Sequence, residues 1–286
     1  MTCANQPDGF KFIEDLTKEL SSKSLIFPTS LNITMRIRRA LREPSASTGD
    51  IARIVGSEPV LSAQLVRLCN SAAFNSGGKP VSDLRTAITR LGFSMVRNVA
   101  ISVGMQQLKQ GEAHGEVPPA IEGLWKRSIR IAALTYVLAK RLTRLNPDSA
   151  MLAGLLHDIG KFYILNRARD YAELFADEQA LWQIVDQWHS DIGDAILESW
   201  EIPQEIRVAV RDHRDYGRTH FGPPDITDIV TAADFLDAQS YPADGEAATS
   251  TTLPQALARL NLDRDKIRIL MDAAKEELAL IFTAIG

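Results

Sequence analysis

The stretch GLLHDIGK, residues 154–161, places a histidine beside an aspartate in an otherwise apolar run. A neutral imidazole nitrogen and a carboxylate oxygen are ligands that zinc, iron, manganese and nickel accept in proteins. Successive helical residues point about 100° apart, so His157 and Asp158 can share one ion only if other helices complete its coordination. The pair alone predicts either a metal site or a hydrogen-bonded polar cluster.

Further candidate ligands lie downstream on separate predicted helices: His189 in WHSDIG, His213 in RDHRDYG and Asp234 in TAADFLD. Each has another interpretation. His189 can belong to a helix cap, His213 can stabilise a helix C-terminus through its dipole, and Asp234 can be a hydrogen-bonded polar residue in an apolar helix. A metal site therefore requires these side chains to meet at one place.

The elements that would bring them together are helices. Apolar residues recur at helical spacing along nearly the whole chain, and the alternating runs typical of strands are nearly absent. We predict an all-α protein. The clearest helices span about residues 83–91, 94–108, 121–142, 147–165 and 263–284. Gly92 is expected to separate the first two, and Asn146 to cap the helix that carries the His-Asp pair. Predicted loops lie at 216–225 and 241–254, with a Gly/Pro linker at 109–120.

Composition narrows the function classes. The 286 residues are 45% hydrophobic and 24% charged, as in a folded globular protein, and the net charge of -4 argues against general nucleic-acid binding. Two cysteines provide no disulfide framework. We find neither a signal peptide nor an apolar run of about 18 residues, so we expect a cytoplasmic protein without membrane association.

Several spaced motifs in this order resemble the HDOD family, the regulatory relatives of HD-domain and HD-GYP phosphohydrolases. The resemblance covers about residues 26–240. It is carried by FPTSLNITMRIRRAL, DIARIVGSEPVLSAQLVRLCNSAAF, AITRLGFSMVRNVAI, LWKRSIRIAALTYVLA, AGLLHDIGKFYIL and HSDIGDAILESWEIPQEIRVAVRDHR. It implies a helical amino-terminal subdomain packed on an HD-like helical bundle, in a bacterial signal-transduction setting.

On this resemblance we divide the chain into a helical extension (1–25), the amino-terminal helical part (26–115), the HD-like bundle (116–240), and a loop with C-terminal helices (241–286). No receiver or output domain fits into the two ends, so we expect the signal to arrive from, or pass to, another protein. The last helix is expected to close the bundle; a homodimer interface is the alternative.

HD-superfamily enzymes ligate metal through an early histidine, the His-Asp pair and a late aspartate. By resemblance, His157 and Asp158 match the pair, and Asp234 matches the late aspartate. His189 and His213 fall where two-metal phosphodiesterases place additional histidines.

The early histidine is the departure from this pattern. Relatives have it in a W-x-H-S pattern, whereas here Trp125 and Ser128 flank Arg127. A guanidinium offers no lone pair and repels a dication, so Arg127 cannot ligate a metal. We therefore predict a degenerate metal site.

Three functions follow. The favoured one is a non-catalytic regulatory module without a cofactor, which binds a partner protein or small ligand and in which Arg127 pairs with Asp158. The second is a metal-dependent phosphohydrolase or phosphodiesterase with a weak divalent transition-metal site, in which metal-activated water attacks phosphorus. In the third, a nucleotide-like anion is held without hydrolysis by basic residues near the pair: Lys126, Arg127, Arg130 and Lys161.

Overall fold

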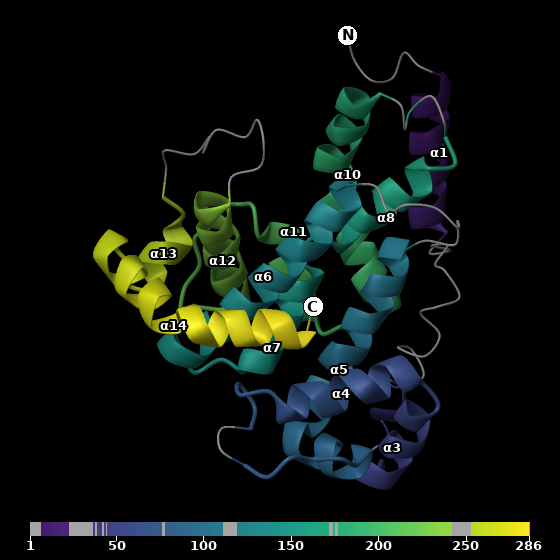
Figure 1. The fold of residues 1–286 in the computed structure, drawn as a ribbon. Coiled ribbons are helices and arrows are strands. Elements are labelled where there is room, and N and C mark those ends of the chain that lie inside the picture. The colour runs from purple at the N-terminus through teal and green to yellow at the C-terminus, as the bar shows by residue number, and fades with distance from the viewer. Residues whose placement is uncertain are drawn as a thin grey trace.

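A computed structural model describes residues 7–22, 37, 39–41, 43, 45–75, 78–110, 119–171, 174, 177–241 and 253–285. Throughout these ranges the regular structure is helical and no strand occurs, which confirms the all-α prediction (Figure 1). The same residues contain no helix that is long and apolar enough to span a bilayer.

The described part of the amino-terminal subdomain includes α3 (Thr48–Gly56), α4 (Pro59–Asn70) and the first part of α5 (Leu84–Gln110). A capping box between Ser47 and Asp50 starts α3. Within α5, Gly92 has φ 78° and ψ 161°, so the helix is kinked there. Positive φ is easily adopted by glycine, and the predicted stop at Gly92 is confirmed as this kink.

The HD-like bundle surrounds α6 (Pro119–Leu142). This helix contacts α7 (Pro147–Leu156), α8 (Ile159–Ala168) and α12 (Ile226–Ser240). The bundle also contains α10 (Glu178–Ser199), which packs on α8, and α11 (Gln204–Asp212), which packs on α7, α10 and α12. Nearly every residue of α6 from Ile129 to Ala139 is buried, as expected for a helix with neighbours on all sides. The predicted Asn146 cap is confirmed, because its side chain accepts hydrogen bonds from the backbone N–H groups of Asp148 and Ser149.

The helices at the two ends of the chain pack on this bundle. α1 (Pro7–Ser21) lies beside α10 and α8, and its Glu19 accepts hydrogen bonds from Tyr163 and Arg167. α13 (Gln255–Arg259) packs on α12, and α14 (Arg264–Ile285) crosses the bundle along α6 (Figure 1). Its packing fits the expectation that it closes the bundle.

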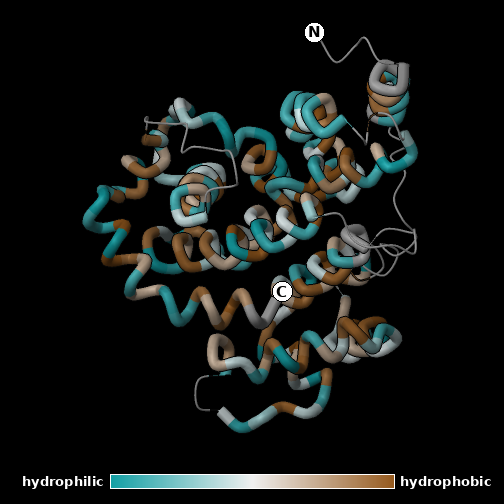
Figure 2. Tube along the Cα trace, turned by 45° about the horizontal axis from the view of Figure 1, so that its top comes forward, coloured by the Kyte–Doolittle hydropathy of each residue, from teal (hydrophilic) through white to brown (hydrophobic). Residues whose placement is uncertain are grey.

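A continuous apolar core runs from the amino-terminal subdomain into the bundle, through side chains such as Leu65, Met95 and Leu152. Figure 2 shows apolar residues concentrated where the helices face one another. The two parts are therefore packed together, as expected. A second apolar cluster joins α6, α12, α13 and α14.

Two predicted boundaries are wrong. The helix expected from 147 to about 165 is two helices, because Asp158 leaves the helical region at φ -107° and ψ 19°, which turns α8 toward α10. The linker expected at 109–120 is shorter, because α5 extends to Gln110 and α6 begins at Pro119; residues 111–118 lie outside the described residues. The loop at 216–225 is non-helical as predicted, whereas residues 242–252 of the second loop are not among those described.

Candidate functional site

Two glycines bring the helices of the site close to the His-Asp pair. A Cβ on Gly154 would lie 2.4 Å from Thr135 Oγ1 and 2.9 Å from the Ile131 carbonyl oxygen, so the glycine lets α7 approach α6. A Cβ on Gly160 would lie 1.9 Å from the carbonyl oxygen of His189, so this glycine lets α8 approach α10. The glycines of GLLHDIGK therefore position α6 and α10 beside His157 and Asp158.

Three predicted histidines are oriented in the same way by their own helices. Nδ1 of His157 lies 2.8 Å from the Gly154 carbonyl oxygen, and Nδ1 of His213 lies 2.7 Å from that of Val210. Nδ1 of His189 lies 2.9 Å from the carbonyl oxygen of Val185. A carbonyl can only accept, so Nδ1 donates in each case, and Nε2 is the nitrogen left for the site.

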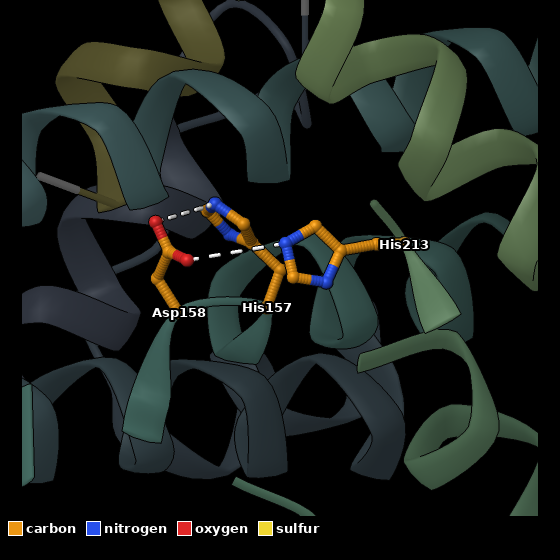
Figure 3. Close-up of side chains that lie close together, drawn as sticks. All are labelled: His157, Asp158 and His213. Atoms are coloured by element: carbon orange, nitrogen blue, oxygen red, sulfur yellow. Dashed lines mark ion pairs between the residues drawn. The ribbon is translucent and has the colours of Figure 1, made fainter. Parts of the chain in front are cut away.

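The structure brings the His-Asp pair and His213 together (Figure 3). His157 Nε2 lies 3.1 Å from Asp158 Oδ2, and His213 Nε2 lies 3.9 Å from Asp158 Oδ1. Asp234 is adjacent, with Oδ1 3.9 Å from His157 Nε2. His189 stands farther out, its ring centroid 6.1 Å from that of His213.

Arg127 enters this cluster from α6. Its Nη2 donates to Asp234 Oδ1 at 2.6 Å, and its Nη1 lies 3.5 Å from Asp237 Oδ2. The expected pairing with Asp158 is a longer contact, 3.9 Å from Nε to Oδ2. The guanidinium thus holds the late aspartate directly and reaches the carboxylate of the pair.

Asp237 is a site residue that our sequence reasoning missed. Arg130 donates two hydrogen bonds to its carboxylate, 2.6 Å from Nε to Oδ1 and 2.9 Å from Nη2 to Oδ2. Residues three apart share a helix face, so Arg127 and Arg130 of α6 oppose Asp234 and Asp237 of α12. This matching i, i+3 spacing was visible in the sequence.

The four basic residues predicted to hold an anion are placed differently from one another. Lys161 is buried and its Nζ lies 2.8 Å from Asp158 Oδ1. Lys126 is exposed on α6, and its Nζ lies 3.6 Å from Glu122. Arg127 and Arg130 are each bonded to an aspartate, so three of the four already hold a buried carboxylate.

Burial and charge together set the protonation states. Burial raises the pKa of Asp158, but His157 and Lys161 more than offset this and hold it well below its usual value. Burial likewise opposes ionisation of Asp234, yet Arg127 lowers its pKa to about 2. Burial lowers the pKa of His213 to about 3. Near neutral pH the two carboxylates are therefore charged and His213 is neutral.

The ion pairs balance the charges of the cluster. Arg127 contacts the carboxylates of Asp158, Asp234 and Asp237. Arg130 also contacts Asp237, and Lys161 also contacts Asp158, so three cations face three carboxylates. Arg214 also acts on Asp158 and Asp234, and it has its own partner in Asp186 at 3.8 Å. With the histidines and this pair set aside, the six side chains carry no net charge. If a neutral histidine stood in place of Arg127, the same cluster would carry one net negative charge.

The resemblance implies a divalent metal here, and the donors can be tested for it. His157 Nε2, His213 Nε2 and both carboxylate oxygens of Asp158 are buried and form no hydrogen bond within the described part of the chain, and these side chains converge as metal ligands do. However, Asp158 and Asp234 already pair with Lys161 and Arg127, so a dication would add two charges to a balanced, buried cluster. As arranged, the residues do not fit a divalent metal.

A second group of metal-type residues has a structural explanation. His220, Asp225 and Asp228 lie close together at the start of α12. Arg218 holds Asp225 at 2.6 Å, and Arg259 holds Asp228 at 3.1 Å. These arginines neutralise the carboxylates and fasten the loop before α12 to α13.

An all-helical bundle that centres on a His-Asp pair defines this chain as an HD-like protein. The HDOD domain model matches residues 27–216, and the chain belongs to the HDOD domain family.

Solved structures share this fold. A candidate metal-dependent phosphohydrolase from Shewanella amazonensis SB2B is 24% identical with a TM-score of 0.76, and the alignment covers 98% of this chain and 100% of that one. An HDOD domain protein from Geobacter sulfurreducens is 22% identical with a TM-score of 0.65, over 95% and 96% of the two chains. A candidate signal transduction protein from Marinobacter aquaeolei VT8 is 21% identical with a TM-score of 0.62, over 97% and 65%.

One curated relative comes from Treponema pallidum (strain Nichols) and is described as an uncharacterized protein. It is 24% identical over 226 residues, which are 74% of this chain and 42% of the relative. The chain thus spans less than half the length of that relative.

Proposed function

We propose that this chain is a non-catalytic regulatory module of bacterial signal transduction, in which the ion pairs of Arg127 replace the metal of an HD centre. The observation that carries the proposal is the balance of three cations and three carboxylates around the His-Asp pair. Such a cluster is stable without an ion, because each buried charge has a partner. The module would act by binding a partner protein or a small anionic ligand.

Binding of a nucleotide-like anion at the pair itself is less well supported. Arg127, Arg130 and Lys161 each hold a buried aspartate, so a phosphate would have to displace a carboxylate to reach them. Lys126 is the member of that set with a largely exposed side chain. A partner protein, or an anion bound elsewhere on the chain, is the form of the proposal that we favour.

The alternative is a metal-dependent phosphohydrolase. It is favoured by the convergence of His157, Asp158 and His213 and by the Nε2 atoms that form no hydrogen bond in the described chain. A metal bound there would act as a Lewis acid on a phosphoester. The alternative requires Arg127 to release Asp234.

Turnover separates the two functions. The assay is hydrolysis of bis(4-nitrophenyl) phosphate with added manganese, iron, nickel or zinc, for the unmodified chain and for Asp158→Asn. We expect both proteins to give the same background rate. A metal-dependent rate that Asp158→Asn abolishes would overturn the proposal in favour of the phosphohydrolase.

A further inference from the structure

A cavity of about 530 Å³ lies between α6, the end of α12 and α14, and Arg130 and Asp237 are among its lining residues. This volume is within the range of about 300–1,000 Å³ that is typical of ligand pockets. Its walls are mainly apolar and include Leu134, Met271, Leu278 and Phe282. Phe282 remains 36% exposed, so an apolar ligand in the cavity would remove further apolar surface from water.

Lys275 stands within the apolar stripe that α14 presents to this cavity. Met271, Lys275, Leu278 and Phe282 all line the cavity and follow helical spacing, so one face of α14 carries a single charge among apolar side chains. Lys275 is exposed, and no ion pair or hydrogen bond of its ammonium occurs within the described part of the chain. It is therefore a cation without a carboxylate partner there.

Arg130 also lines this cavity, but its charge is already paired with Asp237. Two of its N–H groups hold Asp237, and its guanidinium lies 4.5 Å from the ring centroid of Tyr241. Asp237 is the acidic residue of the lining; it is buried and neutralised by Arg130, which leaves Lys275 uncompensated.

We propose that this cavity binds a small amphipathic carboxylate, with its acid group at Lys275 and its apolar body against Met271, Leu278 and Phe282. An apolar body alone would leave Lys275 unpaired, and a bare inorganic anion would leave the apolar wall exposed. Asp237 contacts both Arg130 and Arg127, so the occupied cavity would be connected to the His-Asp cluster through one carboxylate. The site would give the proposed regulatory module its ligand, but binding does not depend on the absence of a metal.

Ligand-observed NMR with 4-phenylbutyrate tests this site, with 4-phenylbutyramide and inorganic phosphate as matched probes. We expect 4-phenylbutyrate to bind saturably and the neutral amide to bind about tenfold more weakly. Inorganic phosphate should not compete with the acid. Lys275→Glu should weaken binding of the acid about tenfold, and Ala279→Trp, which fills the cavity from its exposed side, should abolish it.

Arg264→Glu is the matched control, because it changes the charge of an exposed residue on the same helix away from the cavity. It should leave the Kd within about twofold. The inference is overturned if the acid does not bind, if acid and amide bind equally, or if Arg264→Glu has the effect of Lys275→Glu. Metal content and phosphodiester turnover are measured separately, so failure here is distinct from failure of the proposed function.

Discussion

Replacing Arg127 by methionine is expected to destabilise the chain strongly. The substitution removes the 2.6 Å contact with Asp234 and leaves carboxylates at Asp158, Asp234 and Asp237 facing only two cations. Breaking a buried ion pair costs about 3–5 kcal/mol, and the 19% exposure of Arg127 places this case near 3 kcal/mol. For a chain of this size, that corresponds to a decrease in Tm of roughly 5 °C.

Thermal unfolding and urea denaturation measure this effect. Arg53→Met is the matched control, because Arg53 is 80% exposed and pairs with Asp50 on the surface; it should change the stability by less than about 1 kcal/mol. Adding Asp234→Asn to Arg127→Met should recover about 2 kcal/mol, since the double variant leaves no excess carboxylate. If Arg127→Met cost no more than Arg53→Met, the claim that Arg127 neutralises the cluster would be wrong.

Three further predictions concern the same site. Gly160→Ala should lower the free energy of unfolding by about 3 kcal/mol or more, because its Cβ would lie 1.9 Å from a backbone oxygen. Gly123→Ala, with nothing within 4 Å of its Cβ, should be neutral or stabilising. Thermal unfolding of the two variants, followed by circular dichroism, checks this. The free energy of unfolding should fall by about 1.4 kcal/mol per pH unit as the pH decreases from about 6.5 toward about 3, because the folded chain keeps His213 neutral while the unfolded chain binds a proton there. Urea titrations at pH 7 and 5 should show a smaller decrease in stability for His213→Asn than for the unmodified chain. An equal decrease would contradict this prediction. Asp237→Asn should lower the free energy of unfolding by about 2–3 kcal/mol, because Arg130 and Arg127 lose their shared carboxylate. Denaturant unfolding measures this loss, and an unchanged stability would mean that the pairing contributes little.

Much of the fold could be predicted from the sequence because its signals are local. The helical spacing, the Asn146 cap and the Gly92 stop depend on nearby residues, and the structure agrees with them. The break at Asp158 could not be predicted in this way. Beyond the break, Gly160 packs against His189 of α10, which is a contact between distant parts of the chain.

The sequence indicated which side chains gather at the site better than it indicated which of them pair. Of the five side chains in the predicted metal set, His157, Asp158, His213 and Asp234 come together, whereas His189 lies farther out. The partner of Arg127 was expected to be Asp158, but the closest carboxylate is that of Asp234. Which of two nearby carboxylates a guanidinium bonds depends on the distance between helices, and a sequence pattern does not contain that distance.

The most direct test of the central claim is the metal content of the purified chain and of Arg127→His, after growth with iron, manganese, nickel and zinc and purification without chelator. Elemental mass spectrometry gives the ratio of metal to protein. We expect the unmodified chain to hold little metal and Arg127→His to gain it, because the variant restores a ligand and leaves one net negative charge; Lys126→His, one residue away and exposed, is the control. Near-stoichiometric metal in the unmodified chain that disappears in Asp158→Asn would contradict the account.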